Sequence, residues 1–164
     1  MERELRRLAE VMERLTQQFD ELHAALLRER LQLKARQPEK VEAEAQAIEA
    51  LLERLRAEEN ERKTLVDALG TALKLPPERR AAQDFDLALK GRSGLLAPRD
   101  RLKAAAERAD YANRENQAIL QGLNDAADLL IKTLVDASAV ERGGYDRKGG
   151  RRGGAGMSLF SRQL

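Results

Sequence analysis

The chain has 164 residues, of which 35% are charged and 3% are aromatic, and it contains no cysteine. Its size allows one domain with a modest core, and the dominance of alanine, leucine, glutamate, arginine, lysine and glutamine is typical of long helices and coiled coils. Without cysteine, disulfides and thiolate metal sites are excluded, and no apolar run approaches the roughly 20 residues that a membrane-spanning helix needs. The charged N-terminus "MERELRRLAE" lacks the pattern of a secretory signal, so we expect a cytoplasmic protein without membrane insertion.

Prolines divide the chain into three long segments with helical periodicity. They stand at positions 38, 76, 77 and 98, and proline begins helices easily but interrupts them in the middle. Within each segment the apolar residues recur at alternating steps of three and four, a heptad pattern that predicts a helix with one apolar seam. We therefore predict helices over residues 2–36, 39–74 and 98–140. The three seams are, in chain order, Leu5, Leu8, Met12, Leu15, Phe19, Leu22, Leu26 and Leu33; Val41, Ala45, Ile48, Leu52, Leu55, Val66, Leu69 and Leu73; and Leu102, Ala105, Ala109, Ala112, Asn116, Ile119, Leu123, Ala126, Leu130 and Leu134.

The connections between these segments predict how the helices pack. The break at "RQPEK" is short, so the first two helices should form an antiparallel hairpin. In the second connection Phe85 and Leu89 lie at helical spacing, which predicts a short helix near residues 77–90 that caps the hairpin and is ended by Gly91 and Gly94. The third helix then runs back roughly parallel to the first. The predicted fold class is all-α: an antiparallel bundle of three long helices with one short connecting helix and a flexible C-terminal tail.

The end of the chain, "GGYDRKGGRRGGAGMSLFSRQL", differs from the rest in composition. It holds seven of the 11 glycines, and from residue 141 onward there are six basic and two acidic residues, which is a net charge of +4. Ordering such a segment costs roughly 1–2 kcal/mol per residue, and its few apolar side chains cannot offset that cost. We therefore predict a helical domain over residues 1–140 and a disordered, basic tail over residues 141–164.

Polar residues interrupt all three apolar seams. Counting outward from the two connections places Gln17 or Gln18, Glu59, Arg62 and Asn116 in one shared layer. Such a layer can fix the register of a helical bundle, as single polar residues do in coiled coils. A binding role for the same residues is the alternative.

Residue types that carry chemistry are scarce in this sequence. The single histidine, His23, stands off the seam and is expected to be solvated, and one histidine without cysteine does not make a zinc site or a cysteine–histidine nucleophile. The acidic residues alternate with basic ones at helical spacing, as on a solvated helix face. The segment "GGRRGG" lacks the Gly-Lys-Ser/Thr of a phosphate-binding loop. We therefore predict no catalytic residue, no cofactor and no metal.

The third segment and the tail carry motifs of a known family. "NRENQAILQGLNDAADLLIKTL" followed by "YDRKG" resembles the C-terminal half of the FlgN family of flagellar export chaperones, in which an Asn-x-x-Asn pair opens an amphipathic stretch and a tyrosine element with glycine follows the helix. Here the pair is Asn113 and Asn116, and the element is Tyr145, Asp146 and Gly149. The stretch "LLRERLQLKARQPEKVEAEAQAIEALLERLRAEENER" resembles the acidic helical hairpin of that family. The tail after Gly149 departs from it by its high glycine content.

The resemblance implies a function as well as a fold. It implies a bacterial cytoplasmic chaperone, independent of nucleotides, that holds the hook–filament junction proteins before flagellar type III export, with components of the export apparatus as further partners. The residues expected to bind the partner are Asn113, Asn116, Leu120, Leu123, Leu130, Leu134 and Tyr145.

Whether the apolar stripe of the third helix is core or partner surface stays open in the sequence. Leu120, Ala127, Ile131 and Val135 widen the seam beside Leu123, so one stripe can serve the bundle and a partner helix. Beyond Leu129 we favour partner binding, because the third helix is the longest and its end is expected to extend past the hairpin. Two other functions remain as alternatives: a coiled-coil protein that associates into a homo-oligomer, and a small RNA-binding protein acting through the arginine-glycine tail. Nucleic acid is not the expected partner, because the first 140 residues carry a net charge of −2.

Overall fold

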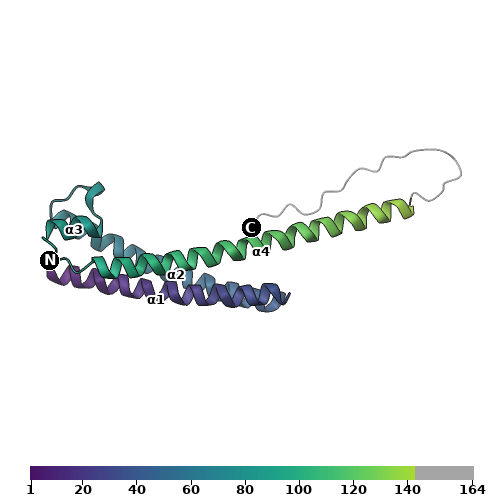
Figure 1. The fold of residues 1–164 in the computed structure, drawn as a ribbon, viewed down its shortest axis with the longest axis horizontal. Coiled ribbons are helices and arrows are strands. Elements are labelled where there is room, and N and C mark those ends of the chain that lie inside the picture. The colour runs from purple at the N-terminus through teal and green to yellow at the C-terminus, as the bar shows by residue number, and fades with distance from the viewer. Residues whose placement is uncertain (143–164) are drawn as a thin grey trace. The chain divides into compact units, whose positions relative to one another are not determined.

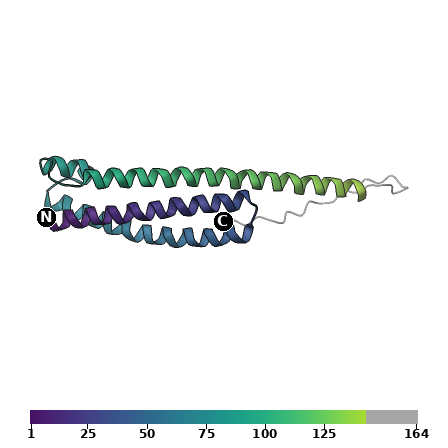
Figure 2. The same cartoon turned by 60° about the horizontal axis from the view of Figure 1, so that its bottom comes forward.

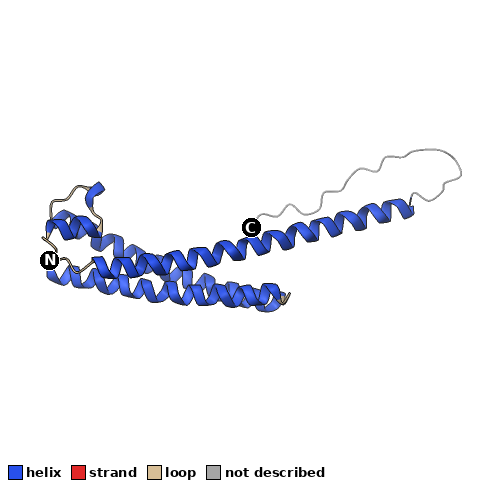
Figure 3. Ribbon diagram, in the orientation of Figure 1, coloured by secondary structure: helices blue, strands red, loops and turns tan. Residues whose placement is uncertain are grey.

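The computed structural model describes residues 1–142, and it describes side chains as far as residue 133. All the regular structure in this part of the chain is helical (Figures 1 and 3), which confirms the predicted all-α class. The long helices are α1 (Glu2–Lys34), α2 (Pro38–Ala72) and α4 (Leu96–Arg142). The predicted short helix is present as a 3-10 turn, η1 (Pro77–Arg79), followed by α3 (Ala82–Ala88). The predicted bounds of the three long helices are each within two residues of the observed ones. Proline begins α2, as its fixed φ angle favours.

The chain divides into two units, Met1–Gly122 and Leu123–Leu164. Unit 1 contains α1, α2, η1, α3 and the part of α4 up to Gly122. The described part of unit 2 is the rest of α4. The tail was predicted to begin at residue 141, but Glu141 and Arg142 still belong to α4. The rest of the predicted tail, residues 143–164 with Tyr145, lies outside the described residues.

Helices α1 and α2 form the predicted antiparallel hairpin in unit 1. Arg28 near the end of α1 pairs with Glu44 near the start of α2, at 3.1 Å, and Arg7 near the start of α1 pairs with Glu61 farther along α2, at 2.7 Å. The predicted seam of α1 is buried apart from Phe19, which is half-buried, and two more residues, Val11 and Ala25, are fully buried. Because α1 packs against α4 as well as α2, one seam does not cover its buried face.

The predicted seam of α2 is partly wrong. Leu51 and Leu65 are buried where Leu52 and Val66 were expected, and Leu52 is 39% exposed. The reason is that two apolar residues follow one another at each of these places, and heptad spacing alone does not tell which of the two turns toward the core.

In unit 1, α4 runs parallel to α1 (Figures 1 and 2). Arg101 pairs with Glu13 and Arg108 pairs with Asp20, and both pairs join residues that are 88 positions apart. Because this separation in residue number is the same for both pairs, the two helices run in the same direction. The α4 residues turned toward α1 are small, and Ala105, Ala109 and Ala112 are all buried.

The connection between α2 and α4 is part of the hydrophobic core. Phe85 on α3 is 1% exposed and belongs to the same cluster as Leu8 and Leu69 of the hairpin. The loop that follows is held by Asp86, whose carboxylate accepts hydrogen bonds from the backbone N–H and the hydroxyl of Ser93, at 3.2 and 2.7 Å. We refer to this connection, residues 73–95, as the connecting module. It anchors the start of α4, as expected for a segment whose short helix caps the hairpin.

The first three α-helices end on basic residues in the left-handed backbone region. Arg36, Lys74 and Lys90 have φ angles of 55°, 56° and 54°, and each follows the last turn of its helix. After α3 the N–H of Gly91 donates to the carbonyl of Asp86, a hydrogen bond that closes the helix end around Lys90. The prediction that Gly91 and Gly94 end this helix is confirmed in part. Both glycines have positive φ angles, 78° and 68°, and Gly91 closes the helix end, but Lys90 before them is also in the left-handed region. A residue with a side chain is strained there, by roughly 1–2 kcal/mol.

Changing Arg36→Gly should therefore stabilise the protein. We expect the free energy of unfolding to rise by about 0.5–1 kcal/mol, because glycine adopts positive φ without a steric cost but is more flexible when unfolded. Urea unfolding followed by circular dichroism measures the change. As a matched control, Lys34→Gly, at the last helical residue of α1, should lower the free energy by about 1 kcal/mol. A stability loss in both variants would contradict the strain argument.

Candidate partner-binding surface

Asn116, the second residue of the asparagine pair, is the centre of a polar cluster inside unit 1. It is 1% exposed. Its amide nitrogen donates to the carbonyl of Leu26 at 2.8 Å and to the carboxylate of Glu29 at 2.7 Å, while its amide oxygen accepts from Arg30 Nε at 2.9 Å. Arg30 also donates to the carbonyl of Ala112 at 3.0 Å and pairs with Glu115. All the polar groups of Asn116 are used within the chain, which leaves none for a partner.

The predicted shared polar layer does not exist. Glu59 and Arg62 pair with each other along α2, with both Arg62 contacts at 2.7 Å, and Asn116 bonds to residues of α1 far beyond Gln18. The hydrogen bond from Arg62 lowers the pKa of the Glu59 carboxyl. The prediction failed because it treated the second connection as a symmetric turn, whereas that connection contains α3 and sets a different register.

The cluster predicts that the two asparagines of the pair differ in their effect on stability. Asn116→Ala should lower the free energy of unfolding by about 2 kcal/mol, because it leaves Glu29 and the Leu26 carbonyl without their partner in a partly buried place. Asn113→Ala, at the exposed member of the pair, should change it by less than about 0.5 kcal/mol. Thermal or urea unfolding of the two variants measures both values. Equal effects would show that the cluster does not fix the register of α1 and α4.

The apolar residues of α4 from Leu120 onward are exposed. Leu120 and Leu123 are each 38% exposed, one on each side of the boundary between the units, and Leu130 and Ile131 are 65% and 60% exposed. Within unit 2, Leu123, Ala127, Leu130 and Ile131 follow one another at helical spacing, and we refer to these four residues as the α4 stripe. The side chain of Leu134 lies outside the described residues. Large apolar side chains exposed on one face of a helix are typical of a surface that binds a partner.

The first residue of the asparagine pair, Asn113, lies at a different surface. It lines an apolar groove in unit 1 together with residues of α1 and α2. Those predicted partner-binding residues whose side chains the structure describes therefore lie in different environments. Asn116 is in a buried cluster, Asn113 is at a groove, Leu120 is exposed in unit 1, and Leu123 and Leu130 belong to the α4 stripe. The sequence pattern did not distinguish these places, because it contains no information about which neighbours cover each helix face.

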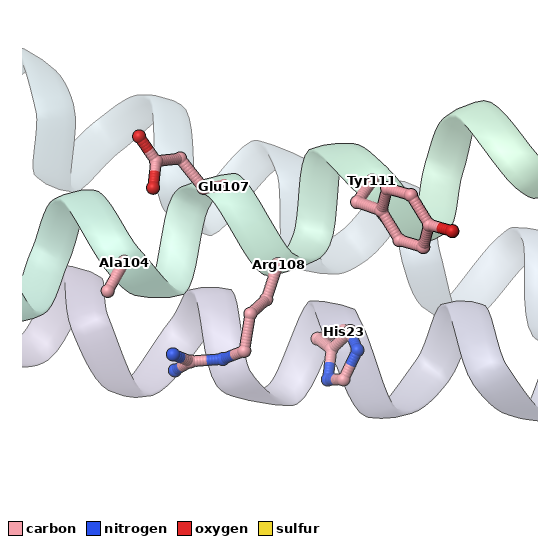
Figure 4. Close-up of a pocket in the computed structure, with 5 residues that line it drawn as sticks. All are labelled: His23, Ala104, Glu107, Arg108 and Tyr111. Atoms are coloured by element: carbon pink, nitrogen blue, oxygen red, sulfur yellow. The ribbon is translucent and has the colours of Figure 1, made fainter.

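The single histidine lies in a shallow pocket between α1 and α4 (Figure 4). It is half-buried rather than solvated, which corrects the expectation, and Ala104, Glu107, Arg108 and Tyr111 line the pocket with it. Glu107 lies on the side of α4 away from His23, and Arg108 is paired with Asp20 at 2.7 Å. The hydroxyl of Tyr111 donates to Glu115 at 3.1 Å. The members of an acid–base pair would point toward one reacting group, and these side chains do not converge in that way.

Two features are absent from the residues that the structure describes. None of their helices is long and apolar enough to cross a membrane. Within the same part of the chain, no group of three or more histidine, cysteine, aspartate or glutamate side chains could hold a metal ion.

Fold and surface together define an all-helical protein that presents an apolar helix face. A family model described as FlgN protein matches residues 1–153. The chain belongs to the FlgN family, a family of flagellar export chaperones, which confirms the resemblance seen in the asparagine pair and the tyrosine element. No curated protein and no solved structure matches the chain.

Proposed function

We propose that the protein is a cytoplasmic chaperone that binds the hook–filament junction proteins and holds them before flagellar type III export. The family supports a role in flagellar export. The observation that carries the proposal for this chain is the α4 stripe, where Leu130 and Ile131 are more than half exposed. An apolar stripe at helical spacing suits the apolar face of an amphipathic partner helix.

The physical properties of the stripe suit a chaperone that must release its partner. Its binding energy comes from apolar burial, at about 25 cal/mol per Å² of area removed from water. Such burial needs no bound nucleotide and is reversible. The residues beside the stripe include an acidic one, Asp128, and a basic one, Lys132. The stripe would also cover aggregation-prone apolar surface of a partner that is not yet assembled.

Co-purification tests the proposal directly. The tagged chain is expressed with each junction protein in turn, and with flagellin as an exported protein of another class. We expect a stable complex with at least one junction protein and none with flagellin. If the chain retains no junction protein and instead forms a homo-oligomer, the alternative of a self-associating coiled-coil protein replaces the proposal.

The tail gives a separate test of how the partner is bound. A truncation after Glu141 removes all six basic residues of the tail and also removes Tyr145. We expect slower association with the junction protein at low salt, because opposite charges speed the encounter of two proteins. Stopped-flow measurement at two salt concentrations detects this effect. If the truncated chain binds as fast and as tightly as the intact one at low salt, the tail is not part of the site.

A further inference from the structure

Unit 1 contains an apolar groove that is separate from the α4 stripe. Its volume is about 220 Å³, and all three long helices line it. From α1 it takes Phe19, Leu22 and Leu26, from α2 Ile48 and Leu52, and from α4 Ala106, Ala109, Asp110 and Asn113.

The groove is open because α4 contributes alanines there. Ala106 and Ala109 are too short to reach the side chains of α2, so Leu52 at the opposite wall stays 39% exposed. Protein interiors are normally packed with few voids larger than a water molecule. Apolar walls around an unfilled space therefore indicate a place that another apolar side chain can enter.

The charges around the groove indicate what kind of chain enters it. The part of α2 that carries Ile48 and Leu52, residues 39–53, contains five glutamates and one lysine, and Glu44 among them is paired with Arg28 of α1. Glu49 and Glu53 directly follow the two lining residues, are exposed, and form no ion pair within the part of the chain that the structure describes. A bound helix is therefore attracted if basic residues flank its apolar face, and repelled if acidic ones do.

We propose that this groove binds an amphipathic helix of another protein, with apolar residues that enter between α2 and α4 and basic residues on its flanks. Such a helix would complete a four-helix arrangement with α1, α2 and α4. Asn113, an exposed amide on the wall, would pair with a polar side chain of the incoming helix. This explains why the two asparagines have different environments: Asn116 holds α4 to α1, whereas Asn113 faces the site.

The test uses the full chain with the α4 stripe disabled by Leu123→Gln, Leu130→Gln and Ile131→Gln, so that binding at the stripe does not contribute. The probes are two designed helical peptides of about 18 residues, or five turns. They share one leucine face, and they differ in carrying lysines or glutamates on the flanks. Fluorescence anisotropy should show at least tenfold tighter binding of the lysine peptide, with the difference shrinking at high salt.

A pair of groove variants locates the binding. Ala106→Leu fills the groove and should weaken binding of the lysine peptide at least tenfold. Ala104→Leu, the same change two residues earlier on the exposed side of α4, should leave it unchanged. If Ala106→Leu perturbs folding, as urea unfolding would reveal, Leu52→Gln on the opposite wall is the second variant and should give the same loss.

Three results would overturn the proposal. The first is equal binding by the Ala106→Leu and Ala104→Leu variants, and the second is equal binding of the two peptides. The third is a dimer of the free chain in sedimentation that Ala106→Leu converts to a monomer, because the occupant would then be a second copy. None of these results bears on the α4 stripe, so the proposed function would be judged separately.

Discussion

Replacing Leu123, Leu130 and Ile131 by glutamine is expected to weaken binding of a junction protein by at least about 100-fold, which corresponds to roughly 2.7 kcal/mol. The three side chains are large, apolar and exposed on one stretch of α4. Truncating central apolar contacts in an interface commonly costs 1–2 kcal/mol or more for each. Glutamine forms helices well, so the change should remove the contact without weakening the helix itself.

A matched control separates this surface from apolar exposure in general. Leu31 on α1 is 65% exposed, like Leu130, but lies in unit 1. Leu31→Gln should therefore leave binding within about twofold of the unchanged chain, if the stripe is the site. Isothermal titration calorimetry measures the affinities, and circular dichroism checks that helicity is retained. Full affinity in the triple variant would show that the stripe is not the binding surface, and lost helicity would show that it is needed for folding.

Phe85→Ala is expected to produce the largest loss of stability, about 3–5 kcal/mol, which is typical for deleting a buried aromatic side chain. Phe85 is 1% exposed and joins the connecting module to the hairpin core. Its removal leaves a cavity beneath the start of α4. We expect this loss of free energy to exceed that of Asn116→Ala, because deleting a buried aromatic ring costs more than deleting the hydrogen bonds of one amide.

Leu87→Ala is the matched control for this prediction. It lies on the same short helix, α3, but is 71% exposed. Its effect on the free energy of unfolding should stay within about 0.5 kcal/mol. Urea unfolding followed by circular dichroism gives both values. If the two variants lose the same free energy, the connecting module does not belong to the cooperative core.

The helices themselves could be predicted from the sequence because their causes are local. The heptad spacing of residues such as Leu8, Met12 and Leu15 requires a helix with a buried seam, and the same residues are buried in the structure. Pro38 begins α2 at the position that its fixed φ angle favours. The family was also recognisable, since the asparagine pair and the tyrosine element are short motifs that can be read without a fold.

Features that depend on how the helices meet could not be predicted. Val11 and Ala25 are buried because α4 covers a second face of α1, and no spacing within α1 indicates that neighbour. Asn116 was assigned to the wrong layer because its position along the bundle depends on where α4 begins. That starting point is set by the connection that contains α3. Lys90 is in the left-handed region because of the closing hydrogen bonds of α3, whereas the sequence indicated only the glycines that follow it.

The sequence by itself therefore determined that this protein is a set of long amphipathic helices of the FlgN type, because periodicity and proline act over a few residues. Only the tertiary structure decided which apolar faces are buried and which are exposed. Leu55 and Leu130 are both seam leucines, yet one is 6% exposed and the other 65%. Burial is a property of a residue and its neighbours together, and those neighbours are far away in the chain.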